Sequence, residues 1–268
     1  MLKTRILTAL LLMPLILSAL FLLHGKPWSA FTLGICVLGS WEWSRFIGWQ
    51  GLRSVAYVGA TMALGGGLLL LGLPPAAEFG LAIFSLLFWI LVAPAWLHNK
   101  WRLADSPLAA PLGWAILFSS WHAMVVWHER ENGAWVLLAL LAVAWAADTA
   151  AYFAGRRFGR RKLAPSISPG KSWEGVIGAY CGVTVYGVVI ANSPIGSQFG
   201  GYALLPAIWV LTGLSVVGDL LESLFKRQAG LKDSSNLLPG HGGILDRIDS
   251  QLAVLPVSAA LLTLAHLF

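Results

Sequence analysis

The chain is poor in charged residues and in cysteine. Charged side chains make up 11% of its 268 residues, whereas soluble domains carry about 25%. A soluble fold of this length could not bury the apolar surface that remains. The two cysteines, Cys36 and Cys181, lie in apolar runs without a CxxC pair or a Cys/His cluster, which argues against a disulfide framework or a zinc site.

Polar linkers and internal repeats are missing too. No linker rich in Pro, Gly or Ser divides the chain, so we expect a single integral membrane domain over residues 1–268. His128-Glu129 has no second His at the HExxH spacing, which argues against an intramembrane metalloprotease. No repeat of the kind typical of transporters is visible, although a transporter stays an alternative explanation for buried acids beside basic loops.

What the sequence does contain is apolar runs. Hydrophobic residues make up 57% of the chain and the mean hydropathy is +0.74. A membrane-spanning helix needs about 20 mostly apolar residues. We therefore expect an all-α, polytopic integral membrane protein with about nine transmembrane helices. The predicted spans are 6–23, 28–43, 54–73, 79–97, 107–127, 134–153, 174–192, 201–221 and 249–267.

The first span resembles a signal peptide, because Lys3 and Arg5 precede it. It runs for 18 residues, however, and the apolar region of a signal peptide has about 7–15. We predict an uncleaved first helix.

Basic residues predict the orientation of the chain. Nine spans place the termini on opposite sides of the membrane, and 16 of the 18 Lys and Arg residues then share the side of the N-terminus. Since basic loops stay in the cytoplasm, we expect a multi-pass protein of the inner membrane with its N-terminus cytoplasmic and its C-terminus on the other side. The basic face could reflect topology and anionic lipids alone, or a site for a polyanion.

The first polar segment on this face, 154–173, ends in Gly170-Lys171-Ser172. Pro165 stands where the pattern GxxxxGKS needs glycine, so the segment is not a P-loop. Lys171 and Ser172 can still contact phosphate oxygens beside the unpaired N–H groups that begin a helix. Ser172 is alternatively an ordinary N-cap residue, with Glu174 soon after it.

Acidic residues lie inside two predicted spans. Asp148 falls near the end of the sixth span, where a carboxylate costs several kcal/mol unless it is paired, hydrated or bound to a cation. An ion pair with a neighbouring Arg is the alternative to a functional role. In the eighth span, Asp219, Glu222, Ser223 and Lys226 share one helical face, although Glu222 and Lys226 could form an ordinary surface pair.

The second polar segment, 226–247, overlaps the sequence KDSSNLLPGHGGILDRID, Lys232 to Asp249. Its Pro and Gly residues disfavour a helix and let backbone N–H groups approach an anion. Asp246 and Asp249 share a face at the start of the ninth span, where a single acid would be an ordinary partner of the helix dipole. Together with Asp219 they predict an oxygen-ligand site for Mg²⁺. His241 is a candidate phosphate contact.

The C-terminal part of the chain carries the signature of a known family. The stretch SLFKRQAGLKDSSNLLPGHGGILDRID, Ser223 to Asp249, resembles the signature of the phosphatidate cytidylyltransferases (CDP-diacylglycerol synthases). That pattern is S-x-x-K-R, four residues, K-D, a small residue, P-x-H-G-G-x-x-D-R and a following D. Every defined position is filled: Ser223, Lys226, Arg227, Lys232, Asp233, Ser235, Pro239, His241, Gly242, Gly243, Asp246, Arg247 and Asp249.

A second motif supports the resemblance. SPGKSWEG, 168–175, is similar to the family's upstream motif, which often has Lys-Lys-Thr where this chain has Gly170-Lys171-Ser172. The likeness is sharp over about 145–250. The DGxxAR…GxxxDxxxD pattern of the CDP-alcohol phosphatidyltransferases, a rival family at the same interface, is absent.

The resemblance implies transfer of CMP from CTP to phosphatidate, with CDP-diacylglycerol and pyrophosphate as products. It further implies a homodimer in the lipid bilayer, dependence on Mg²⁺ with a second cation left open, and no nucleic-acid partner. Residues 1–130 would supply N-terminal helices, and 134–268 the catalytic helices and loops.

The resemblance also suggests roles for the polar residues. The metal ligands would be Asp219, Asp246 and Asp249, with Asp148 and Glu174 as further candidates. Catalytic contacts would come from Lys171, Ser223, Lys226, Arg227 and Asp246. Substrate would be bound by Ser172, Lys232, Asp233, His241, Gly242, Gly243 and Arg247.

Overall fold

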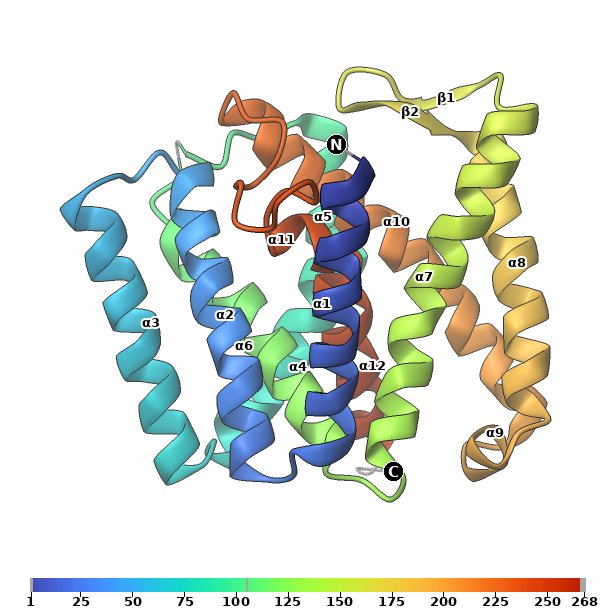
Figure 1. The fold of residues 1–268 in the computed structure, drawn as a ribbon, viewed down its shortest axis with the longest axis horizontal. Coiled ribbons are helices and arrows are strands. Elements are labelled where there is room, and N and C mark those ends of the chain that lie inside the picture. The colour runs from blue at the N-terminus through green and yellow to red at the C-terminus, as the bar shows by residue number, and fades with distance from the viewer. Residues whose placement is uncertain (1, 105, 266–268) are drawn as a thin grey trace.

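The structure is a computed structural model that describes residues 2–104 and 106–265. It is a helical bundle, which confirms the predicted all-α fold (Figure 1). The helices are α1 (Leu2–Leu22), α2 (Lys26–Phe46), α3 (Leu52–Leu71), α4 (Pro75–Leu87), η1 (Phe88–Val92), α5 (Ala93–Asn99), α6 (Ala109–His128), α7 (Gly133–Phe158), α8 (Trp173–Ala191), α9 (Pro194–Gln198), η2 (Gly201–Ala203), α10 (Leu204–Gln228), α11 (Leu245–Ile248) and α12 (Gln251–Ala265).

Each predicted span falls on a helix. Among the described residues, six helices are long and apolar enough to cross a membrane, which agrees with a multi-pass membrane protein. The predicted spans 6–23, 28–43 and 249–267 coincide with α1, α2 and α12, which are not among the six. The number nine therefore stays a prediction, and residues 266–267 of the last span lie outside the described part of the chain.

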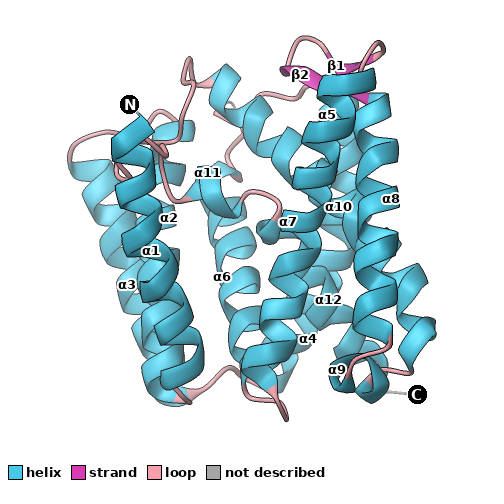
Figure 2. Ribbon diagram, turned by 45° about the vertical axis from the view of Figure 1, so that its right-hand side comes forward, coloured by secondary structure: helices cyan, strands magenta, loops and turns pink. Residues whose placement is uncertain are grey.

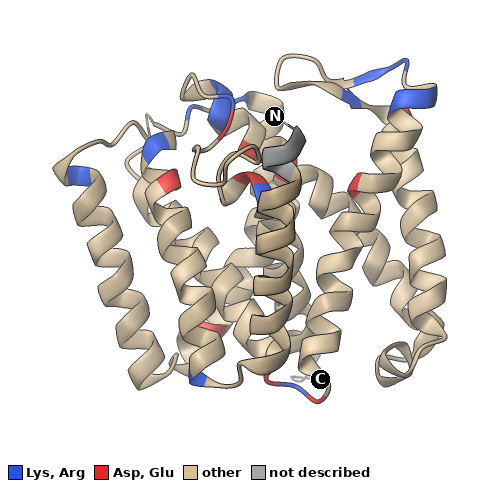
Figure 3. Ribbon diagram, in the orientation of Figure 1, with Lys and Arg blue, Asp and Glu red and all other residues tan. Residues whose placement is uncertain are grey.

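The two ends of the bundle differ in charge. Helix α1 begins at one end and α12 ends near the other (Figure 1). Most Lys and Arg residues gather at the end where α1 begins (Figure 3). The polar segments of the sequence lie at this same end.

Two predicted loops contain more regular structure than we expected. Helix α7 continues to Phe158 and α10 to Gln228, beyond the predicted limits at 153 and 221. The basic pairs 156–157 and 226–227 occupy the last turns, where positive charge stabilises the helix dipole. Between α7 and α8 the chain forms an antiparallel hairpin of β1 (Lys162–Ala164) and β2 (Ser168–Ser172), which lies above these helices (Figure 2).

Helices α7 and α8 pack closely at Gly178 and Gly182, two glycines at GxxxG spacing. A Cβ atom at Gly178 would collide with Ala154 of α7, and one at Gly182 would collide with Ala150. Small residues let two backbones approach closely. Helix α8 is thereby held against α7, and the polar residues at the upper ends of both helices are brought together.

Candidate functional site

A cavity of about 440 Å³ opens between α7, α8 and α10, next to the hairpin. Its acidic and basic lining comes from separate elements: Asp148 from α7, Lys171 from β2 and Asp219 from α10. Ser172 and Arg156 complete the polar lining. The other lining residues are mostly apolar or small: Ala151, Tyr152, Gly155, Leu163, Gly170, Gly175, Val176 and Val216.

The start of α8 fixes the hairpin side of the cavity. Ser172 Oγ accepts a hydrogen bond from the N–H of Gly175 at 3.2 Å, which confirms its predicted role as an N-cap. Glu174 accepts hydrogen bonds from the backbone N–H groups of Arg160 at 3.0 Å and Arg161 at 3.2 Å. Glu174 thus ties the hairpin to α8, and it does not line the cavity.

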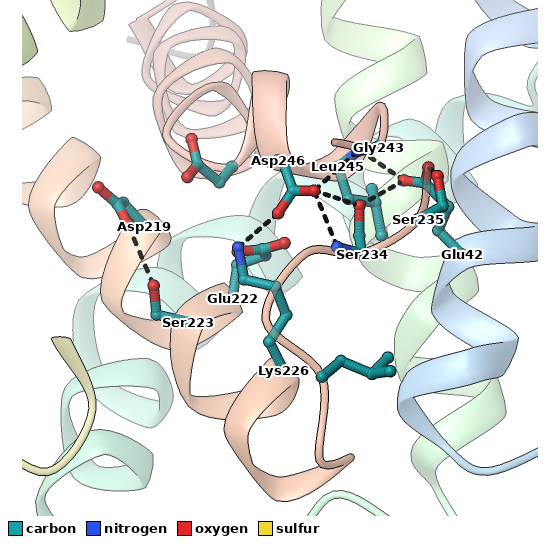
Figure 4. A network of polar contacts seen from close by, with 12 residues as sticks. Glu42, Asp219, Glu222, Ser223, Lys226, Ser234, Ser235, Gly243, Leu245 and Asp246 are labelled. Atoms are coloured by element: carbon teal, nitrogen blue, oxygen red, sulfur yellow. Dashed lines mark hydrogen bonds and ion pairs between the residues drawn. The ribbon is translucent and has the colours of Figure 1, made fainter. Parts of the chain in front are cut away.

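An ion pair crosses the cavity. Lys171 Nζ lies 2.5 Å from Asp219 Oδ2, and each side chain is 24% exposed. Ser223 Oγ is 3.4 Å from Asp219 Oδ1 (Figure 4). The predicted polar face of the eighth span is therefore confirmed as a face that points into the protein.

Asp249 belongs to the same electrostatic group. The prediction placed Asp249 at the start of the last span, but in the structure it precedes α12. Its Oδ1 accepts a hydrogen bond from the N–H of Ser250 at 2.7 Å. Its carboxylate interacts electrostatically with the carboxylates of Asp219 and Asp148 and with the ammonium group of Lys171. Three carboxylates are thus close enough to repel one another.

The second polar segment forms a separate network, drawn in Figure 4. Asp246 Oδ2 accepts hydrogen bonds from the N–H and hydroxyl of Ser234 at 2.8 and 2.9 Å and from the N–H of Gly243 at 2.8 Å. Asp246 Oδ1 lies 2.5 Å from Lys226 Nζ, which also pairs with Glu222 at 2.5 Å. We call these five residues the loop network.

The loop network stabilises the ionised form of Asp246. Burial of this carboxyl group would raise its pKa. The hydrogen bonds from Lys226, Gly243 and Ser234 outweigh burial, so the pKa of Asp246 lies below its ordinary value. Asp246 therefore stays charged at neutral pH and holds the loop.

Sequence patterns did not single out Glu42 of α2, which the structure places against the loop network. Glu42 is 0% exposed. It accepts hydrogen bonds from the hydroxyls of Ser234 and Ser235 and from the N–H groups of Ile244 and Leu245. One signal could have found it: Glu42 is an acidic residue inside a predicted span, and such residues are functional candidates by default.

The other predicted site residues lie along the loop. Arg227 Nη1 donates to the carbonyl oxygen of Leu231 at 3.3 Å. His241 is partly buried, and no hydrogen bond is found for its Nδ1 within the described residues. Gly242 has a φ of 84°, which favours glycine. Three further predicted substrate-binding residues of the loop are exposed: Lys232, Asp233 and Arg247.

The three predicted metal ligands do not form one cluster. Within 2–104 and 106–265, no three His, Cys, Asp or Glu side chains are placed to share a metal ion. Asp219 pairs with Lys171, and Asp246 pairs with Lys226. Since like-charged carboxylates repel, each takes a lysine as its partner. The metal roles of these residues stay predictions.

Fold and site together define a multi-pass membrane protein with an acid- and lysine-lined cavity at the basic end of its helix bundle. The chain belongs to the cytidylyltransferase family, whose model matches residues 3–265. It is 40% identical to the phosphatidate cytidylyltransferase of Pseudomonas aeruginosa over 98% of this chain and 97% of that protein. It is 35% identical to the phosphatidate cytidylyltransferase of Haemophilus influenzae over 96% of each chain.

Proposed function

We propose that this protein transfers CMP from CTP to phosphatidate, forming CDP-diacylglycerol and pyrophosphate. The family match along nearly the whole chain carries this proposal. Two features of the structure support it. The cavity brings a lysine and two aspartates to the end of a membrane bundle, and the signature residues form an ordered loop at that same end.

In the proposed reaction, a phosphate oxygen of phosphatidate attacks the α-phosphorus of CTP, and the bond to the β-phosphate oxygen breaks. Pyrophosphate leaves with the electron pair of that bond. A phosphate monoester has a second pKa near 6, so the attacking group is mostly dianionic at neutral pH and needs no strong general base. The protein's main task is to bring two polyanions together.

The residues of the cavity suit this task. Lys171 and Arg156 present positive charge to the phosphate groups, and Ser172 presents a hydroxyl. The apolar part of the lining suits the glycerol and acyl portion of a lipid. We propose that the signature loop, with Lys226, Arg227, Lys232 and His241, meets CTP or the departing pyrophosphate.

The donor set also fits Mg²⁺. Asp148, Asp219 and Asp249 interact electrostatically with one another, and Lys171 is the cation that acts on them all. Mg²⁺ takes hard oxygen ligands and commonly uses one or two carboxylates, waters and substrate phosphates. One or two of these aspartates, together with waters and the substrate phosphates, would hold the ion, which would neutralise phosphate charge. Lys226 holds Oδ1 of Asp246, so metal binding by Asp246 would require Lys226 to turn away.

Orientation and assembly follow as finer parts of the proposal. The basic end of the bundle (Figure 3) would face the cytoplasm of the inner membrane, in line with the positive-inside rule, and would meet CTP there. A homodimer is expected from the family resemblance. Light scattering of the purified protein in detergent, corrected for bound detergent, measures the number of chains in the assembly and so tests the homodimer.

A direct assay tests the proposed function. The purified protein is incubated with CTP labelled in its α-phosphate, phosphatidate and Mg²⁺, and the organic phase is counted. We expect label in the lipid phase that depends on both phosphatidate and Mg²⁺. Controls replace phosphatidate with diacylglycerol, or CTP with γ-labelled CTP, and neither should yield labelled lipid. Absence of labelled lipid from a folded preparation would refute the proposal.

A further inference from the structure

A buried acid in the second helix holds the signature loop in place. Glu42 lies on α2, almost 200 residues before the loop, and is completely buried. Oε1 accepts the hydroxyl of Ser235 at 2.6 Å and the N–H of Ile244 at 2.9 Å. Oε2 accepts the hydroxyl of Ser234 at 3.0 Å and the N–H of Leu245 at 2.7 Å. Each carboxylate oxygen thus lies within hydrogen-bond distance of one hydroxyl and one backbone N–H.

The contacts of Glu42 reach the loop network through one shared side chain. The hydroxyl of Ser234 lies within hydrogen-bond distance of both Glu42 Oε2 and Asp246 Oδ2. Asp246 in turn pairs with Lys226. Glu42, Ser234, Asp246 and Lys226 therefore form a continuous polar chain from α2 to α10 (Figure 4).

The signature glycine at position 243 is explained by the same contact. A Cβ atom at Gly243 would collide with both Ser234 Oγ and Glu42 Oε1. The neighbouring α2 residue Gly39 likewise leaves room for Leu245, which is fully buried. On the same helix, the guanidinium of Arg45 donates to the carbonyl oxygen of Ser234. This face of α2 is shaped to receive the loop.

From this geometry we propose that Glu42 is a positioning residue: it orders the signature loop and so sets the placement of Asp246 and Lys226 for the transfer reaction. The catalytic part of this statement rests on the proposed function. Glu42 itself does not line the cavity. Its effect is exerted through the loop.

The sharpest perturbation is Glu42→Gln, which keeps size and shape. An amide has one acceptor oxygen and one NH₂ donor. Hydroxyls can rotate to accept a hydrogen bond, but a backbone N–H cannot. Whichever way the amide turns, its NH₂ group faces the N–H of Ile244 or of Leu245. One buried donor then loses its partner, which is costly.

The experiment measures turnover and loop mobility in parallel. Asn236, an exposed loop residue, is replaced by cysteine and spin-labelled. The background is Cys181→Ser, because Cys181 is exposed and Cys36 is buried. We expect Glu42→Gln to lower kcat at least tenfold and to sharpen the spin-label spectrum. Wild-type values of kcat and of label mobility in this variant would overturn the proposal.

A matched control separates positioning from general loss of stability. Ser44 also lies on α2, and its hydroxyl is 2.7 Å from that of Ser54, so it joins α2 to α3 instead of the loop. Ser44→Ala should lower thermal stability while kcat stays within about twofold of wild type and the label spectrum is unchanged. If Ser44→Ala, at equal loss of stability, slows turnover as much as Glu42→Gln, positioning is refuted.

A milder variant covers the case in which Glu42→Gln does not accumulate. Ser234→Ala removes the hydroxyl that links Glu42 to Asp246 and leaves Glu42 its other three donors. It should lower kcat about threefold or more and raise label mobility, and no change in either overturns the proposal. The label measurement needs no turnover. If wild-type protein yields no labelled lipid, the proposed function fails while the mobility comparison still decides whether Glu42 orders the loop.

Discussion

The ion pair between Lys171 and Asp219 allows activity and stability to be separated. Replacement of Lys171 by Ala removes the ammonium group that lies 2.5 Å from Asp219 Oδ2. The pair is about one-quarter exposed, so it lies between exposed pairs, worth about 0–1 kcal/mol, and buried pairs, whose disruption costs about 3–5 kcal/mol. We expect the free energy of unfolding to fall by about 1–3 kcal/mol.

The expected effect on the rate is larger. If Lys171 stabilises charge on the reacting phosphates, its loss should lower kcat by about 10²–10³, as removal of one preorganised donor does in other enzymes. Turnover is measured with labelled CTP at saturating substrate, and stability from Trp fluorescence during thermal unfolding in detergent. Lys162→Ala is the control, because Lys162 is an exposed residue of β1 and its replacement removes one positive charge from the same hairpin. A Lys171→Ala variant with more than one-tenth of wild-type kcat would refute this reasoning.

Three further predictions concern packing and pH. Gly178→Leu should collide with Ala154 and separate α8 from α7, so thermal stability and activity should both fall. Gly218→Ala places a Cβ atom 2.7 Å from the carbonyl oxygen of Asp249; we expect a loss of about 1–3 kcal/mol by overpacking, seen in thermal unfolding, and wild-type stability would contradict it. Because the folded-state pKa of Asp246 is lowered, its stabilisation is complete above about pH 4 and is lost as pH falls through the folded-state value. The free energy of unfolding of Asp246→Asn should not show this loss as pH falls. An identical pH dependence of stability in the variant and the wild type would contradict the assignment.

The sequence was sufficient to predict the helices and the polar face of α10. Apolar runs placed every span on a helix, since burial in lipid requires about 20 apolar residues whatever the neighbours are. The spacing of Asp219 and Ser223 was sufficient to predict that they share one helix face, and in the structure their side chains are in contact. Ser172 was identifiable as an N-cap because capping is local. These features depend on residues close together in the chain.

The remainder depended on partners far apart in the sequence. The hairpin was expected to be a loop, and its ties to α8 include Glu174, whose hydrogen bonds reach 13 and 14 residues back. The hydrogen bonds to Glu42 join residues that are 192–203 positions apart in the chain, and no periodic pattern reveals such contacts. The same limit applies to Asp246. It pairs with Lys226 instead of joining other carboxylates at a metal ion, and this pairing depends on the three-dimensional placement of the side chains.

The long sequence separation between Glu42 and its hydrogen-bond donors has a consequence for biosynthesis. Helix α2 is synthesised early, but the carboxyl group of Glu42 has no loop donors until the chain has been made as far as residue 245. Until then, water or lipid headgroups must supply the hydrogen bonds that this carboxyl group later receives from the loop. The segment 134–268 expressed alone would have no substitute for α2, and a truncated enzyme would carry every signature residue without the scaffold that orders them.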